Sequence, residues 1–409
     1  MNWTWAAARY LRQPFSKVCL KNHSCNLHAR FARDFALIRL TQPAAPPSFR
    51  RNLQQIAAYI LQKAFFKHAL GRKTAAVTEN GGIGVNEKNL ALLEQYDLQV
   101  KGFRRGRGAY VLDTDQGLKL FTEFSGTERR LLFQNRICEK LEELGTLYVD
   151  RVRPSKEGSL IVKDRDEQGY IVKDWFEGRE CSTRSEEDIL KAVKLLAQIH
   201  VVLRISDEEF QGRFVGMPFP EECIRKLREM KKTRIYMRGR SQKSPFERRF
   251  LDTFDLFYDQ AENVCRELEK WDSQKLFASS VKEGKICHGD YNHHHVYLAG
   301  TEAAVMDFNR ARYDVQILDL YQILRKMMEK QNWDVRLGKK MLETYEKVRP
   351  LSEEEHRELS LRLTFPEKFW KLANHYYNGK KAKAPEKGME KLETLAVQEE
   401  YRQNFLKAL

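Results

Sequence analysis

The chain is most constrained by a polar loop and a second acid that follow each other closely near position 300. An apolar approach ends in His288-Gly289-Asp290, a histidine-rich loop follows, and a short β-type run ends in Asp307-Phe308. The spacing therefore allows the carboxylates of Asp290 and Asp307 to reach one point, and the remaining chain has to form a scaffold around them.

Two converging carboxylates of this kind suit phosphoryl transfer. His288 is expected to orient the backbone of the loop, and Asp290 to accept the proton of an attacking hydroxyl. Asp307 is expected to hold Mg²⁺ against the phosphates of a nucleotide. These three residues are the candidate catalytic and metal-binding groups.

The pair His288-Gly289-Asp290 and Asp307-Phe308 resembles the aminoglycoside and choline kinase branch of the protein-kinase-like fold. Flanking segments narrow the resemblance to the CotS family of bacterial spore coat proteins, over roughly residues 86 to 409. These segments are Asp-Trp-Phe-Glu-Gly-Arg-Glu-Cys at 174–181, Leu-Asp-Leu at 318–320 with Leu-Arg-Lys at 324–326, and Phe-Pro-Glu-Lys-Phe-Trp at 365–370 with His-Tyr-Tyr at 375–377.

The resemblance implies a bilobal α+β fold of the protein-kinase-like type. A small antiparallel β-sheet lobe is expected at 86–176 and a larger helical lobe, which carries the catalytic loop, at 177–409. ATP and Mg²⁺ are the implied cofactors of an active protein, with a small hydroxylated molecule as acceptor. Other spore coat proteins are the implied partners, and the implied location is the mother-cell cytoplasm and then the spore coat.

Two glycines and a lysine are the candidates for contact with nucleotide phosphates. The runs on either side of residues 104–108 predict a β-hairpin, and Gly106 and Gly108 in its turn would let backbone N–H groups approach a phosphate. A plain turn is the alternative. The resemblance implies that Lys119, on the apolar strand 117–121, pairs with the α- and β-phosphates. The alternative is an ordinary strand lysine that points at solvent.

Kinases hold this lysine with a glutamate from the following helix. Here Ser125 to Glu128 form a capping-box pattern that predicts the start of that helix, but its middle reads Phe133-Gln134-Asn135. Glu128 comes early and Glu139 late, so the partner of the lysine stays unassigned. Farther on, the segment Asp174–Gly178 resembles the hinge between the lobes, which implies that the backbone near Asp174 and Phe176 contacts an adenine ring.

The second metal ligand departs from the family pattern. The resemblance predicts an asparagine five residues after Asp290, where this chain has His295. An amide oxygen suits Mg²⁺, whereas imidazole is a softer ligand that prefers zinc, copper or nickel. Asn292 would supply an amide only if the loop has a different shape. Asp319 matches the family aspartate that braces the loop by hydrogen bonding, with a helix N-cap as the alternative role.

The net charge of +15 is concentrated at the start of the chain. Residues 1–80 hold 13 Lys and Arg against two acids, which is +11, so the remaining 329 residues carry only +4. This balance makes nucleic acid an unlikely partner for the body of the protein. Lys226 to Arg249 form a strongly basic stretch that predicts either a solvated helix face or a grip on a polyanionic substrate.

Residues 1–85 do not resemble the family and are expected to form a basic, disordered extension. An alternative is that translation begins at Val85, because Gly81-Gly82 can be encoded by GGAGGA, a ribosome-binding sequence, at a suitable distance from a GTG codon. No apolar stretch near the start is long enough to span a bilayer, so we expect no membrane association. Seven scattered cysteines without paired spacing indicate a reducing compartment.

Two functions of different class remain open from the sequence. The first is a CotS-like spore coat component whose kinase fold serves assembly, a pseudokinase with weakened or absent catalysis. The second is an active ATP- and Mg²⁺-dependent phosphotransferase acting on a small hydroxyl-bearing molecule such as a sugar or amino alcohol. A third function, anion or nucleic-acid binding, depends on the basic extension. The family resemblance favours the coat role.

Overall fold

The computed structural model describes residues 87–106, 108–145, 147–378 and 385–409. The expected extension at 1–85, with the alternative start at Val85, lies outside these residues. We propose that the described chain divides into two lobes after Phe176, because the main sheet ends at Asp174 and helices dominate from Glu186 onward.

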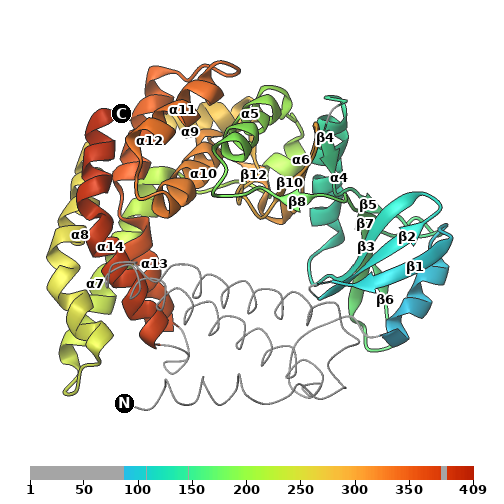
Figure 1. Ribbon diagram of the computed structural model, residues 1–409, viewed down its shortest axis with the longest axis horizontal. Helices are drawn as coiled ribbons and strands as arrows, with labels where there is room; N and C mark the ends of the chain where they lie inside the picture. The colour runs from blue at the N-terminus through green and yellow to red at the C-terminus, as the bar shows by residue number, and fades with distance from the viewer. Residues whose placement is uncertain (1–86, 107, 146, 379–384) are drawn as a thin grey trace, which may run out of the picture. The chain divides into compact units, whose positions relative to one another are not determined.

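An antiparallel sheet dominates the first lobe, and its strands lie side by side in Figure 1. The strands follow the order β1-β2-β3-β7-β5, and β6 pairs with the start of β7. Their bounds are β1 (Val100–Arg105), β2 (Ala109–Thr114), β3 (Gly117–Glu123), β5 (Val152–Arg153), β6 (Val162–Lys163) and β7 (Gly169–Asp174). The hairpin expected from the sequence is therefore present as β1 and β2.

Helices cover both faces of this sheet. The 3-10 helix η2 (Glu87–Gln95) packs on the face that carries Phe121 and Val172. The helix α4 (Glu128–Glu142) packs on the opposite face, where Leu131 contacts Ile171. Since successive side chains of a strand alternate between the two faces, each position of β3 and β7 is assigned to one helix or the other.

One detail near these helices differs from the sequence expectation. The N-cap of α4 is Thr127, whose hydroxyl accepts from the backbone N–H of Arg130, rather than the expected Ser125. The expected capping box is therefore absent at α4.

A second sheet joins segments from both lobes. It contains β4 (Leu147–Val149), β11 (Glu302–Val305), β10 (Val296–Ala299) and β8 (Arg179–Glu180), in that order. The pairing of β4 with β11 is parallel, whereas the other pairs are antiparallel. A third, two-stranded sheet pairs β9 (Ile286–Cys287) with β12 (Arg312–Tyr313). The polar loop starts at β9 and ends at β10, so both of its ends are fixed.

Helices form the rest of the chain, and Figure 1 shows α7, α8, α13 and α14 running alongside one another. The helices of this lobe are α5 (Glu186–Val202), α6 (Glu208–Gln211), α7 (Phe219–Gly239), α8 (Pro245–Glu269), α9 (Ser273–Lys282), the 3-10 helix η3 (Phe308–Arg310), α10 (Ile317–Lys330), α11 (Val335–Glu346), α12 (Glu353–Thr364), α13 (Glu367–Asn378) and α14 (Pro385–Ala408). Within the described part of the chain, every helix is too short or too polar to cross a bilayer.

An aromatic cluster holds α8 against α13. Phe369 on α13 is fully buried and stacks on Phe250 with ring centroids 4.4 Å apart, and on Phe257 at 4.7 Å. Such pairs add stability beyond the apolar area that they bury. The helical lobe therefore depends on this cluster for the position of its C-terminal helices.

Replacing Phe369 by alanine is expected to lower the free energy of unfolding by about 3–5 kcal/mol, because it leaves a cavity between α8 and α13. Urea unfolding followed by circular dichroism measures this loss. Phe103→Ala is the matched control, since Phe103 is 52% exposed and its removal leaves no buried cavity. Equal losses in the two variants would contradict the role assigned to the cluster.

Candidate functional site

One buried carboxylate holds the start of the polar loop. Asp319, in the first turn of α10, accepts the backbone N–H of His288 at 2.6 Å and that of Gly289 at 2.9 Å. Its Oδ2 also lies 3.3 Å from Nε2 of His200, a fully buried histidine on α5. The cap of α10 is Gln316, so Asp319 makes the bracing contact rather than serving as an N-cap.

The ionisation of this group follows from its partners. Burial alone would raise the pKa of Asp319, but hydrogen bonds from His200 and from the loop backbone hold it below the ordinary value. Burial lowers the pKa of His200, so that ring is neutral near pH 7. The brace is therefore a carboxylate whose charge is stabilised mainly by hydrogen-bond donors.

Gly289 is required by the shape of the loop. Its φ is +81°, a conformation that side chains disfavour, and a Cβ there would lie 2.1 Å from the carbonyl oxygen of Arg310. The loop thus packs directly on the segment that follows Asp307. This explains why the sequence has glycine between His288 and Asp290.

His288 connects the loop to the residue before Asp307. Its Nδ1 accepts the backbone N–H of Asp290 at 3.3 Å, so Nε2 carries the proton and donates to the carbonyl oxygen of Met306 at 3.0 Å. Burial lowers the pKa of His288, which favours this neutral form. The ring is buried and positions the two acids; it presents no group to a substrate.

Asp290 is ionised and paired. Its Oδ1 lies 3.0 Å from Nζ of Lys326 on α10. Burial opposes ionisation, yet the hydrogen bond and charge of Lys326 lower the pKa of Asp290. Asn292 donates to both the carbonyl and the carboxylate of Asp290, and its amide oxygen accepts from the N–H of His294 at 3.0 Å. The amide of Asn292 is therefore turned toward the loop and not toward Asp307.

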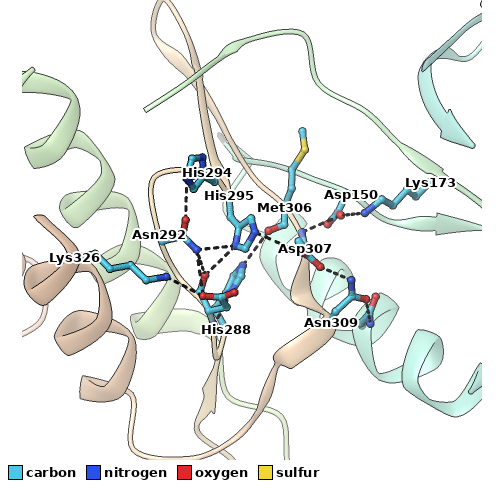
Figure 2. Close-up of polar contacts among 12 residues, drawn as sticks. Asp150, Lys173, His288, Asn292, His294, His295, Met306, Asp307, Asn309 and Lys326 are labelled. Carbon is cyan, nitrogen blue, oxygen red and sulfur yellow. Dashed lines mark hydrogen bonds and ion pairs between the residues drawn. The ribbon is translucent and has the colours of Figure 1, made fainter. Parts of the chain in front are cut away.

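His295 lies between the two acids, as Figure 2 shows for its contacts with Asn292 and Asp307. Nδ1 lies 2.9 Å from the carbonyl oxygen of Asp290, an acceptor, and 3.2 Å from the amide nitrogen of Asn292, a donor, so these contacts do not fix the tautomer of the ring. Nε2 lies 3.4 Å from Oδ2 of Asp307. A proton on Nε2 or a metal ion between the two atoms satisfies this contact. The donor set of one carboxylate and one imidazole fits a divalent metal.

Asp307 is held in an unusual backbone conformation. Its φ is +69°, which is uncommon outside glycine and typical of functional sites. Its N–H donates to Oδ2 of Asp150 at 3.0 Å, and its Oδ1 accepts from the amide of Asn309. The oxygen of Asn309 in turn accepts from Gln134 on α4 at 2.9 Å. The mid-helix residue that replaces the expected glutamate thus reaches Asp307 through neutral hydrogen bonds.

A lysine from β7 approaches this acid. Nζ of Lys173 lies 2.6 Å from Oδ2 of Asp150, the same oxygen that accepts the N–H of Asp307 (Figure 2). Burial would lower the pKa of Lys173, but the charges of Asp150 and Asp307 raise it above the ordinary value. Lys173 is therefore a partly buried ammonium, with a side chain 14% exposed, near the proposed metal ligand.

Lys119 is on the other face of the sheet. It shares the face of Phe121 and η2, and its Nζ lies 3.1 Å from Oδ1 of Asp174, directly opposite on β7. Asp174 is also bound by two nitrogens of Arg153. Lys119 lies opposite Asp174, and Lys173 is the next residue along β7, so the two lysines point to opposite faces of the sheet. The contacts of Lys119 are therefore on the η2 face and do not include Asp307. The side chain of Asp174 is likewise engaged in this ion-pair cluster.

The remaining candidates are the two glycines of the hairpin and the hinge segment. The N–H of Gly106 donates to the carbonyl of Ala109 at 2.8 Å, and Gly108 has a φ of +69°, so both glycines shape the turn between β1 and β2. Phe176 is buried against Ala304 and Met306, next to the end of the second sheet. These contacts place the hinge segment beside the residue that precedes Asp307.

Sequence reasoning missed Asp150, Lys173 and Gln134. A lysine that directly follows the apolar run Tyr170–Val172 was the available signal, since a charge at the end of a buried strand requires a partner. Asp150 follows the strand β4 and carried no motif.

Gly289→Ala is expected to lower the free energy of unfolding by about 1–3 kcal/mol more than Gly117→Ala, because of the clash with Arg310. Gly117 is a matched control: its φ is +82°, but nothing lies within 4 Å of its Cβ position. Urea unfolding of both variants separates the strain of a positive φ from the close contact. Similar losses would mean that the loop relaxes away from Arg310.

The comparisons with known proteins agree with this geometry. The profile of the family described as "Spore coat putative kinase YutH" matches residues 89–409. Spore coat protein S of Bacillus subtilis (strain 168) is 24% identical over 314 residues, which is 76% of this chain and 89% of that protein.

Solved structures share the fold. An aminoglycoside phosphotransferase from Alicyclobacillus acidocaldarius superposes with a TM-score of 0.70 at 20% identity, covering 81% of this chain and 97% of that one. The AMP-bound spectinomycin phosphotransferase APH(9)-Ia gives 0.54 at 12% identity, covering 78% and 98%. The expected bilobal kinase-like α+β fold and the resemblance to spore coat proteins are confirmed. The chain belongs to the spore coat putative kinase YutH family.

Proposed function

We propose that this spore coat family protein is an ATP- and Mg²⁺-dependent phosphotransferase that acts on a hydroxyl group. The observation that carries the proposal is the meeting of Asp290, His295, Asp307 and Lys173 in one connected set of contacts. Membership of the family supports a location in the spore coat and other coat proteins as neighbours. The nucleotide-bound relatives of the fold, spectinomycin phosphotransferase with AMP and with ADP, support a nucleotide as the donor.

Each acid has a separate role in this proposal. Asp290, kept ionised by Lys326, accepts the proton of the acceptor hydroxyl. Asp307 and His295 would hold Mg²⁺, which when bound supplies positive charge to the nucleotide phosphates. His288 and Asp319 keep the two acids in position from the buried side. The turn with Gly106 and Gly108 and the hinge near Phe176 are the proposed contacts with phosphates and adenine.

Lys173 takes the role that the resemblance assigned to Lys119. A lysine that neutralises phosphate charge has to lie beside the metal-binding aspartate, and Lys173 shares the carboxylate of Asp150 with the backbone of Asp307. Asp150 then replaces the missing helix glutamate as the residue that orients the lysine.

A scaffold without catalysis is the second candidate. The observation that favours it is the ion pair between Asp290 and Lys326, which occupies the carboxylate that has to receive a hydroxyl proton. In this case the fold would serve coat assembly, with other coat proteins as partners. Binding of nucleotide separates the two candidates before any acceptor is known.

Lys173→Met is expected to lower ATP turnover about 100-fold, because it removes the cation that faces the phosphates. Lys119→Met, the matched variant on the opposite face, is expected to lose stability while keeping turnover within a few-fold. Release of ADP at saturating acceptor, or the slow release with water as acceptor, measures both. Loss of turnover in Lys119→Met with full turnover in Lys173→Met would restore the assignment that the sequence suggested.

His295 is expected to change the metal preference. Because imidazole is a softer ligand than an amide, the protein should bind ATP more tightly with Mn²⁺ than with Mg²⁺, and His295→Asn should shift this ratio toward Mg²⁺ by about 10-fold. Calorimetric titration of ATP with each metal gives the ratio. Asp307→Ala should abolish metal-dependent binding. An unchanged ratio in His295→Asn would remove His295 from the metal site.

A further inference from the structure

A cavity of about 120 Å³ opens beside Asp290 and its ion-pair partner Lys326. Residues of α7, α10, α12 and α13 line it together with the loop and the segment after η3. Seven lysines and arginines stand in the lining against three acids, Glu222, Asp290 and Glu367. Six of these seven cations pair with a carboxylate, and among the described residues Arg310 is the cation of the lining without such a partner.

Part of this charge is balanced from within the protein. Lys226, the first residue of the basic stretch 226–249, is buried between Glu222 and Glu367. Arg362 is buried between Glu358 and Glu222. These ion pairs are structural, so the residues that matter for a ligand are the ones with hydrogen-bonding capacity left over.

Two buried atoms of the lining lack partners among the described residues. Arg325 is only 7% exposed, and although its Nη1 pairs with Glu329, its Nε has no hydrogen bond. Gln322 donates to the carbonyl of Gly289 at 3.1 Å, but its Oε1 is buried without a donor. Such groups are costly unless a ligand or water satisfies them, so these two residues of the lining have hydrogen-bonding capacity left for a polar molecule.

Two further cations face the cavity from the catalytic side. Arg310 is exposed, makes no hydrogen bond or ion pair within the described chain, and its charge lowers the pKa of Asp290. Among the residues that the structure describes, Lys326 is paired with Asp290 alone, at 3.0 Å. An anion entering the cavity would offer Lys326 a second partner, which would loosen its hold on Asp290 just where a hydroxyl has to bind.

We propose that the acceptor is a small hydroxylated molecule that carries an anionic group, a phosphate or a carboxylate, which Arg310, Lys326 and Arg325 recognise. The inference rests on the proposed phosphotransferase function. The acceptor oxygen bonds to the γ-phosphorus of ATP while the bond from that phosphorus to the bridging oxygen breaks. Asp290 takes the hydroxyl proton, and ADP leaves with the electron pair of the broken bond. A polycationic acceptor such as an aminoglycoside is excluded by repulsion from the same residues.

The test uses the full chain and four six-carbon sugar derivatives that differ in charge. Calorimetry without nucleotide measures the binding of neutral glucose, of cationic glucosamine, and of the two anions glucose 6-phosphate and gluconate. Inorganic phosphate serves as a fifth probe. At least one anionic member is expected to bind about 10-fold more tightly than glucose, and glucosamine not at all. The phosphate and carboxylate arms identify which anion is preferred. Equal binding of all members, or no binding of the anions, overturns the inference.

Matched variants decide whether the cavity is responsible. Arg310→Ala is expected to weaken the preferred anion about 10-fold, whereas Arg228→Ala, an exposed arginine of α7 outside the lining, should leave it unchanged. Equal affinities in the two variants would also overturn the inference. ATP binding with Mg²⁺ is measured in parallel: its absence contradicts the proposed function, while ATP binding without anion binding contradicts only the acceptor class.

Discussion

The polar loop that begins at His288 depends on the buried carboxylate of Asp319. An ionised acid in the interior is costly unless donors surround it, and here two successive loop N–H groups and His200 supply them. His200 also contacts the hydroxyl of Tyr345 at 2.7 Å, so the brace extends from α10 to α5 and α11. The loop is thus fixed to the helical core at its first two residues, and the positions of Asp290 and His295 follow from that attachment.

The second sheet performs a similar task for the other acid. β4 leaves the strand-rich lobe and pairs in parallel with β11, the strand that leads to Asp307. Asp150 comes directly after β4, so the strand pair that connects the lobes also brings Asp150 to the N–H of Asp307. Lys173 arrives from β7 at the same carboxylate. The pairing of β4 with β11 therefore both connects the lobes and places Asp150 and Lys173 near Asp307.

The sequence predicted the kinase-like fold and the family, because the order of the motifs depends on local spacing. The roles that it assigned to Asp290, Asp307 and His295 stay predictions. The sequence did not predict which lysine faces the site. Strands with apolar cover on both sides lack a polar face, so the parity of β3 and β7 cannot be read from their residues. The residues of β3 and β7 alone do not tell whether Lys119 or Lys173 lies on the face of α4. The positions of η2 and α4 on opposite faces make that distinction. The sequence also did not single out Asp150, because it is the parallel pairing of β4 with β11 that brings Asp150 to the N–H of Asp307.

The origin of the lysine and its carboxylate also bears on how such a protein can be controlled. In protein kinases the equivalent ion pair joins a strand to a helix, so rotation of that helix breaks it and switches the enzyme off. Here Lys173 and Asp150 come from a strand and from the end of another strand, and α4 contributes only the neutral contact of Gln134. A swing of α4 would leave the pair intact. For the proposed phosphotransferase, control would then act through the supply of nucleotide and acceptor rather than through movement of α4.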